Sequence, residues 1–282
     1  MNDDALQGML FGAISTDDTA AETAPAGELR ICALNVNSPS PGRAQRIVDW
    51  LLTTGSNTLV LTEMQPSEAG RHMLAYLAAE GFTTTCTPGW KDTRYFATIA
   101  TRGFAAALVQ PAAFDPRIVC ADLADGHGTV RLVGIYGLTN GMTPESSQRR
   151  RDFQRRLLDY LKLVNSPGLC VAGDLNVVEP GHRPHLPAFE DHDYACYTGL
   201  LDLGLRDAYR TLHPSGDDHS WTSPRFGGQR LDHSLVGTAA GEIRTCAYDH
   251  ATRHEGLSDH AALLTTVGLT TSWTAPNGGP LR

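Results

Sequence analysis

Short apolar runs that end in polar residues recur along the chain and predict buried strands. One of them, residues 169–178, reads Leu-Cys-Val-Ala-Gly-Asp-Leu-Asn-Val-Val. A continuous apolar run is expected of a strand covered on both faces, where an unpaired carboxylate is costly. Asp174 and Asn176 are two residues apart, so their side chains point to the same side of an extended chain. The run predicts a buried strand with chemistry at its end, although an Asp that only caps the following turn is an alternative at this point.

The apolar pattern also predicts strands and helices in the rest of the chain. Further strands are predicted at residues 29–36, 58–61, 82–86, 96–101, 105–110, 118–123, 129–136, 229–236 and 243–248, and an apolar run follows at 263–267. Helical spacing of apolar residues predicts helices at 43–53, 69–80 and 143–163, and two helical pieces between 194 and 212. We expect 96–101 and 105–110 to pair around Gly103, and 118–123 and 129–136 to form a hairpin. Strands and helices alternate in clusters, which favours an α/β fold of packed mixed sheets flanked by helices.

Composition favours one domain. The 282 residues are 41% hydrophobic and 19% charged, and no low-complexity linker divides them. Residues 1–28 are rich in Ala, Asp, Thr and Glu, and we interpret them as an acidic, mostly disordered arm. The folded domain is expected over residues 29–268, with a loose tail at 269–282.

Charge and cysteine usage exclude some classes of protein. The net charge of -8 argues against a protein that coats nucleic acid by bulk attraction, but a local basic groove remains compatible with it. The arginines of the 143–163 helix are most simply a solvated face, with a phosphate-contacting surface as the alternative. The six cysteines contain no Cys-x-x-Cys motif, which favours reduced core residues. With no basic leader and no apolar run of membrane length, we expect a soluble, cytoplasmic monomer.

Polar residues gather at the ends of predicted strands, which is where a rigid sheet presents functional groups. These residues are Asn35, Glu63, Asp174, Asn176, Asp232, Asp259 and His260. Oxygen ligands such as Glu63 and Asp259 suit a hard cation and indicate Mg²⁺ or Mn²⁺ in preference to Zn²⁺. Asp232 near His260 would fix the tautomer of the imidazole and favour its charged form, which is useful against an anionic substrate.

Taken together, the motifs resemble those of the endonuclease/exonuclease/phosphatase superfamily, which includes exonuclease III, abasic-site endonucleases and deoxyribonuclease I. In chain order they are Leu34-Asn35-Val-Asn37, Leu61-Thr-Glu63, Ile135-Tyr136, Gly173-Asp174-Leu-Asn176, Ser220-Trp221-Thr222, Arg230-Leu-Asp232 and Ser258-Asp259-His260. The resemblance covers residues 29–268. It implies a four-layer sandwich in which two mixed β-sheets pack face to face between helices, with the active site at one edge.

The resemblance also implies a role for each site residue. Glu63 would be the principal metal ligand, with Asn35 and Asp259 completing the site directly or through water. Asp174 would orient and deprotonate the attacking water, and Asn176 would hold water or phosphate. His260, paired with Asp232, would stabilise transition-state charge, and Tyr136 would contact the phosphate or the leaving group. The residues expected to contact substrate are Asn37, Trp221 and Arg230 of these motifs and Asn140 of the turn after Tyr136.

The expected function is a Mg²⁺- or Mn²⁺-dependent phosphoesterase, first of all a nuclease that cleaves DNA in preference to RNA. A phosphatase or phosphodiesterase of a nucleotide, lipid head group or sugar phosphate is the alternative within enzymes, and a non-catalytic binding module is the alternative outside them. Abasic-site specificity is in doubt, because Gln229 and His233 stand where DNA-repair members commonly carry hydrophobic or aromatic residues, and the turn after Tyr136 is altered.

Two segments fall outside these motifs. Gln7–Phe11 resembles the short peptide by which bacterial replication and repair proteins dock on the sliding clamp; packing of Leu10 and Phe11 on the domain is the alternative. The His- and Pro-rich stretch 179–191 is long enough to be a functional loop, but the sequence assigns it no role.

Overall fold

The computed structural model of the protein describes residues 27–126, 128–139 and 141–270. Two six-stranded mixed sheets dominate this part of the chain. The first has the order β13-β14-β1-β2-β4-β3, with strands β1 (Glu28–Asn35), β2 (Thr58–Met64), β3 (Thr83–Cys86), β4 (Phe96–Thr101), β13 (Gly241–Asp249) and β14 (Ala262–Leu269). The second has the order β5-β6-β7-β8-β12-β9, with strands β5 (Ala105–Leu108), β6 (Ile118–Ala124), β7 (Thr129–Ile135), β8 (Leu169–Asp174), β9 (Leu205–Asp207) and β12 (Asp232–Gly237).

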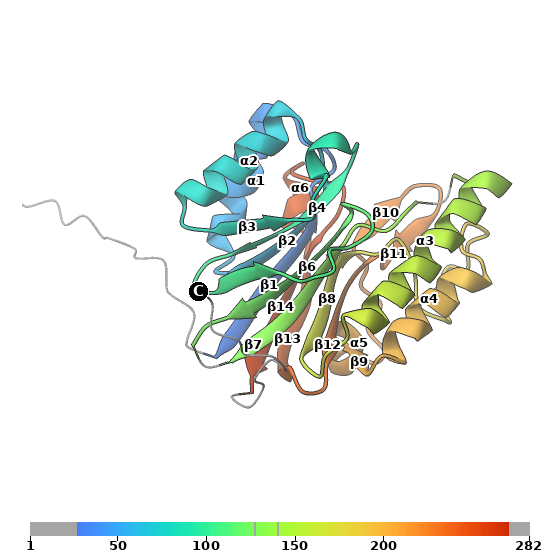
Figure 1. Cartoon of the computed structure of the whole chain (residues 1–282). Coiled ribbons are helices and arrows are strands. Elements are labelled where there is room, and N and C mark those ends of the chain that lie inside the picture. Colours follow the sequence, from blue (N-terminus) through green and yellow to red (C-terminus); the bar gives the residue numbers. More distant parts are fainter. Residues whose placement is uncertain (1–26, 127, 140, 271–282) are drawn as a thin grey trace, which may run out of the picture.

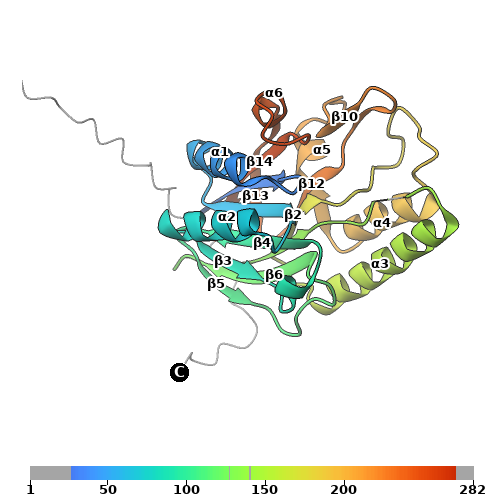
Figure 2. The same cartoon turned by 90° about the horizontal axis from the view of Figure 1, so that it is seen from above.

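Helices cover the outer face of each sheet (Figure 1 and Figure 2). α1 (Pro41–Thr53) and α2 (Glu68–Ala79) cover the first sheet, and α3 (Pro144–Leu163) and α4 (Asp191–Leu201) cover the second. The shorter helices are α5 (Ala208–Leu212), α6 (Ala251–His254) and the 3₁₀ helix η1 (Trp90–Asp92). A small hairpin of β10 (Trp221–Ser223) and β11 (Gly227–Gln229) stands beside the sheets.

Three apolar layers hold the sandwich together. Buried residues such as Val60 and Leu132 pack between the sheets. Ile47 and Met73 join α1 and α2 to the first sheet, and Leu157 belongs to the layer that joins α3 and α4 to the second. At roughly 25 cal/mol per Å² of apolar surface removed from water, such burial is the main source of stability. The four-layer sandwich expected from the sequence is confirmed.

Most predicted elements are present, and the differences have physical causes. The hairpin of β6 and β7 pairs as predicted. The strands on either side of Gly103 do not pair with each other, because β4 pairs in the first sheet and β5 in the second. The segment after Gly204 is partly a strand, since Leu205–Asp207 pairs with the edge of β12. Three residues are too few to display a period of two, so the sequence gives no signal for this strand.

The structure also bears on the expectations about membrane-spanning segments and cysteines. None of the described helices has the length and apolar character needed to cross a bilayer. All six cysteines are free, and all except the half-buried Cys86 lie in the core.

Candidate active site

Several strand ends meet at one edge of the sandwich. β1 and β2 are parallel, so Asn35 and Glu63 lie close to the same ends of their strands. In the second sheet β8 ends with Asp174, and the antiparallel β12 begins with Asp232, which pairs in register with it. A pocket of about 320 Å³ opens here. Its polar lining comprises Asn35, Glu63, Tyr136, Thr139, Arg150, Asp174, Asn176, Trp221, Gln229, Asp259 and His260.

The backbone is held in unusual conformations at this edge. Glu63 has φ 53°, Asn176 has φ 52°, and the adjacent Asn37 and Ser38 have φ 48° and 45°. Left-handed φ values cost non-glycine residues of order 1 kcal/mol or more and cluster at functional sites, where surrounding contacts maintain them. The strain at this edge therefore marks the pocket as a candidate active site.

Asn35 joins two of the carboxylates. Its Nδ2 donates to Oε2 of Glu63 at 3.1 Å and to Oδ2 of Asp174 at 2.8 Å. Its Oδ1 accepts the backbone N–H of Asn37 at 2.8 Å, which orients the amide. Asn35 thus presents hydrogen atoms, and not its oxygen, to the two acidic groups.

Glu63 accepts hydrogen bonds on both of its oxygens. The hydroxyl of Tyr136 donates to Oε2 at 2.9 Å, and that of Ser38 donates to Oε1 at 3.2 Å. Burial and then the charges of Glu63 and Asp174 raise the pKa of Tyr136 above its usual range. Tyr136 is therefore a neutral hydroxyl that donates a hydrogen bond into the pocket.

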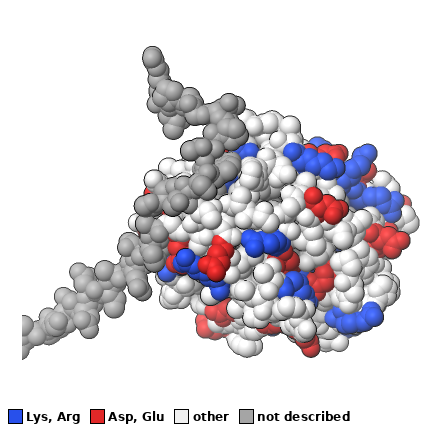
Figure 3. All heavy atoms as spheres, turned by 90° about the horizontal axis from the view of Figure 1, so that it is seen from below, with Lys and Arg blue, Asp and Glu red and all other residues white. Residues whose placement is uncertain are grey.

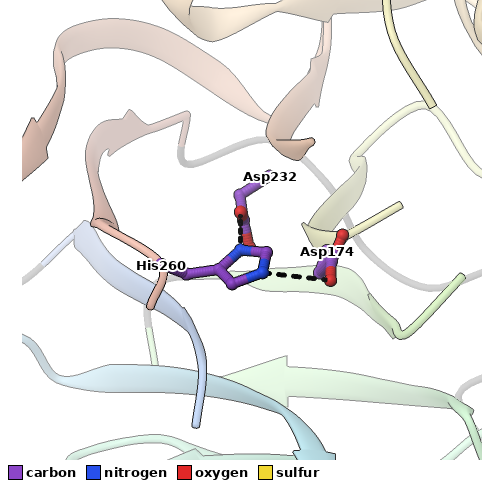
Figure 4. A group of neighbouring side chains, drawn as sticks. All are labelled: Asp174, Asp232 and His260. Carbon is purple, nitrogen blue, oxygen red and sulfur yellow. Dashed lines mark hydrogen bonds and ion pairs between the residues drawn. The ribbon is translucent and has the colours of Figure 1, made fainter. Parts of the chain in front are cut away.

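His260 lies between two buried aspartates (Figure 4). Its Nδ1 is 2.7 Å from Oδ2 of Asp232, and its Nε2 is 4.0 Å from Oδ2 of Asp174. Burial alone would lower the pKa of His260, but the charge and hydrogen bond of Asp232 outweigh it and raise the pKa to about 9. Burial and the charge of Asp232 raise the pKa of Asp174 to about 7, against the opposing effect of His260. The charged imidazole donates from both ring nitrogens, and in that form it offers no lone pair to a metal ion.

The turn after β8 fixes how Asp174 and Asn176 face the pocket. The Asn176 backbone N–H donates to Oδ1 of Asp174 at 3.0 Å, and its Nδ2 contacts Oδ2 of Asp174 at 3.2 Å and the Gly137 carbonyl at 3.1 Å. A Cβ on Gly137 would lie 2.0 Å from the carbonyl oxygen of Leu175, so only glycine allows this approach. The turn is tightly packed, and both side chains are directed by it.

Asp259 and Trp221 stand on the other wall. The indole Nε1 of Trp221 donates to Oδ2 of Asp259 at 3.1 Å, and Trp221 forms a β-bridge with His260. The hairpin of β10 and β11 thereby attaches to the segment that carries Asp259 and His260.

Comparison with known proteins agrees with this geometry. The profile of the endonuclease/exonuclease/phosphatase family matches residues 32–260, which is more than half of the chain. The chain belongs to this family. It is therefore assigned as a hydrolase of phosphate esters, and enzymes of the family generally depend on a divalent cation.

Solved structures of nucleases share the fold. A 3′–5′ exonuclease from Neisseria meningitidis is 25% identical, with 84% of this chain and 98% of that chain covered and a TM-score of 0.69. A 3′ phosphatase from Neisseria bound to a product DNA hairpin is 22% identical, with coverage of 84% and 98% and a TM-score of 0.69. An AP endonuclease from Archaeoglobus fulgidus is 22% identical, with coverage of 86% and 100% and a TM-score of 0.70. No curated protein matches the sequence.

Two of the described residues expected to contact substrate, Arg230 and Asn37, do not line the pocket. Arg230 is fully buried and ion-paired with Glu179 and with Asp207 at 2.8 Å, so it does not face the pocket. We correct that expectation: Arg230 is a core charge that two carboxylates neutralise. The Asn37 carbonyl accepts from Arg43, and Asn37 is absent from the pocket lining among described residues. Asn140 lies outside the described residues, as does the Gln7–Phe11 peptide.

Sequence reasoning missed Arg150. The other arginines of α3 are exposed, but the Arg150 side chain is only 2% exposed and lines the pocket. Helical spacing could have shown this, because Arg150 continues the buried stripe of Phe153, Gln154 and Leu157 at i, i+3, i+4 and i+7.

The His- and Pro-rich loop also has a place in the site. Leu186 and Phe189 pack with Val178 and Leu231 in an apolar cluster. Leu186, Phe189 and Phe226 form the apolar wall of the pocket. Glu179, at the start of the loop, pairs with both Arg210 and Arg230.

Proposed function

We propose that the protein is a Mg²⁺- or Mn²⁺-dependent nuclease that hydrolyses DNA phosphodiesters. The observation that carries this proposal is the juxtaposition, in one pocket, of a charged His260 held by Asp232, a buried Asp174 and the carboxylate of Glu63. Hydrolysis of a phosphodiester needs a base for water, a positive charge for the phosphoryl oxygens and a cation, and this set supplies the first two with ligands for the third.

The donor set fits a hard cation. Glu63 and Asp259 offer carboxylate oxygens in the same pocket, and each carboxylate has more acceptor capacity than its present hydrogen bonds use. Since Asn35 presents its amide nitrogen, its role here is to orient Glu63 and Asp174, and a contact to the ion would pass through water. A bound Mg²⁺ or Mn²⁺ would supply positive charge against the oxygens of the phosphate.

The chain's own groups would perform the remaining steps. Asp174 in its ionised form accepts a proton from the attacking water, and Asn176 holds that water or a phosphoryl oxygen. The His260 imidazolium stabilises the negative charge that develops on the phosphoryl oxygens, while Asp232 keeps it protonated and oriented. Tyr136 directs its hydroxyl toward the same region.

A basic and aromatic rim beside Tyr136 favours a nucleic-acid substrate. The Tyr95 ring packs edge-on against Tyr136 at 5.7 Å between centroids, and the guanidinium of the exposed Arg94 lies 4.9 Å from the Tyr95 ring centroid. The guanidinium of Arg117 is 5.8 Å from Tyr95 and 5.9 Å from Tyr136. Aromatic rings stack on bases and guanidinium groups attract phosphates. On the face shown in Figure 3, acidic and basic side chains are mixed and form no broad basic patch.

The activities of proteins with similar structures support the same proposal. The Neisseria meningitidis enzyme, at 25% identity, is a 3′–5′ exonuclease, and the neisserial 3′ phosphatase was solved with a DNA hairpin. Cytoplasmic location and a monomeric state remain predictions, as does docking of Gln7–Phe11 on a sliding clamp.

A phosphatase or phosphodiesterase of small esters is the second candidate. The apolar wall formed by Leu186, Phe189 and Phe226 favours it, because such a wall could enclose the organic group of a small ester.

Hydrolysis of labelled single- and double-stranded DNA with Mg²⁺ or Mn²⁺, with EDTA as the control, tests the first candidate. A parallel panel of nucleotides, sugar phosphates and lipid head-group esters tests the second. Cation-dependent cleavage of DNA at higher kcat/KM than any small ester is the expected result. Turnover of a small ester with no cleavage of DNA would replace the first candidate with the second, and no cation-dependent hydrolysis of either class would exclude both.

A further inference from the structure

Arg150 connects the catalytic turn to the neighbouring helix pair. Its Nη2 donates to the backbone carbonyl of Asn176, and its Nε lies 2.7 Å from Oδ1 of Asp193, at the start of α4. The guanidinium carbon is 5.4 Å from the centroid of the Phe189 ring. One buried cation therefore touches the active-site turn, α4 and the apolar wall of the pocket.

The partner carboxylate is itself fixed. Asp193 is fully buried, accepts from Nε2 of Gln154 at 2.6 Å, and accepts the Glu190 backbone N–H at 2.9 Å as part of the α4 capping box. These contacts fix the Asp193 carboxylate at the start of α4, where it balances the charge of the guanidinium.

The turn needs such a contact. Asn176 has a left-handed φ of 52°, and its side-chain Nδ2 is already committed to Asp174 and the Gly137 carbonyl. The backbone carbonyl oxygen of Asn176 accepts a hydrogen bond from Nη2 of Arg150. A charged donor on that oxygen favours the strained turn over the extended conformation that a non-glycine residue would otherwise adopt.

We propose that Arg150 is a positioning residue, which holds the Asp174–Asn176 turn through the Asn176 carbonyl so that both side chains face the pocket. The kinetic part of this inference rests on the proposed phosphoesterase function. The structural part, order in the turn, does not.

Arg150 could instead serve only to neutralise Asp193, and a set of variants separates the two roles. Arg150→Met removes the donor and the charge but keeps an unbranched stem beside Phe189. Asp193→Asn removes the buried partner charge but leaves the donor to Asn176. The double variant removes both charges, and Arg149→Met, on the exposed side of the same helix, is the matched control.

We expect a crossed pattern. Arg150→Met and Asp193→Asn each lower Tm by about 10 °C, because each leaves one charge of the buried Arg150–Asp193 ion pair without its opposite charge, and the double variant recovers most of this loss. In contrast, kcat depends on the hydrogen bond from Arg150 to the Asn176 carbonyl. It falls about 100-fold in Arg150→Met and in the double variant, with KM within about threefold, and stays near wild type in Asp193→Asn. Arg149→Met changes neither quantity.

Amide hydrogen exchange of the peptide covering residues 174–178 supplies a readout independent of activity. Faster exchange is expected in the double variant at a Tm close to wild type. A double variant that recovers both Tm and kcat, or that exchanges like wild type, would overturn the positioning role. If wild-type protein hydrolyses no phosphate ester, the proposed function fails, and the exchange comparison still decides whether Arg150 orders the turn.

Discussion

Nδ1 of His260 lies 2.7 Å from Oδ2 of Asp232, and both side chains are buried. This contact raises the pKa of His260 to about 9 from an ordinary value of 6.5, against the opposing effect of burial. A histidine that gains a partner in this way stabilises the fold only while it is protonated. The stabilisation is fully present below about pH 6.5 and is lost as the pH rises through about 9.

The first prediction concerns this pH window. We compare the wild type with Asp232→Asn, in which His260 lacks its carboxylate partner, both without metal. Between pH 6.5 and 9, the unfolding free energy of the wild type should fall by about 3 kcal/mol more than that of the variant. Urea unfolding in EDTA across this range measures it. Parallel curves for the two proteins would show that the Asp232 contact does not hold the proton.

The second prediction concerns the cation. Glu63→Ala should raise the half-saturating concentration of Mg²⁺ at least about tenfold, with a smaller effect on kcat at saturating metal, because the proposed role of Glu63 is to bind the ion. Activity titrations with Mg²⁺ and Mn²⁺ measure both quantities. Ser38→Ala removes one hydrogen bond to the same carboxylate and should have a milder effect in the same direction. An unchanged metal requirement in Glu63→Ala would place the ion elsewhere.

The third prediction separates polymeric from small substrates. Arg94→Glu should raise KM for an oligonucleotide, and should reduce the slope of log KM against log salt by about one, since one phosphate contact is lost. Lys162→Glu, in the last turn of α3, is the control and should leave the slope unchanged. If a small phosphate ester shows the same rise in KM with Arg94→Glu as DNA does, the rim does not follow a nucleic-acid strand.

The sequence allowed much of the fold to be predicted because its signals are local. The run that forms β8 is apolar throughout and ends at Asp174, so both the strand and its polar end are visible without tertiary information. The edge strand Leu205–Asp207 was missed, since it has three residues and exists because β12 offers it an unpaired edge.

The site could be predicted only in part, because some of its contacts depend on the tertiary structure. The motifs identified residues that the fold brings into one pocket from β1, β2, β8 and the segment before β14, which are far apart in sequence. They could not show that Arg230 pairs with Glu179 and Asp207 in the core, because that depends on how the loop after β8 folds back. Arg150 was hidden among exposed arginines, and only its helical phase distinguishes it.

In the proposed mechanism, Asp174 and a charged His260 act together on a phosphodiester. Single-turnover cleavage of a DNA oligonucleotide at saturating Mg²⁺ by wild type, Asp174→Asn and His260→Ala tests it most directly, with thermal melting as the check on folding. We predict that each substitution lowers kcat by about 1000-fold or more, while the fold is retained. Turnover near the wild-type rate in either variant would contradict the claim.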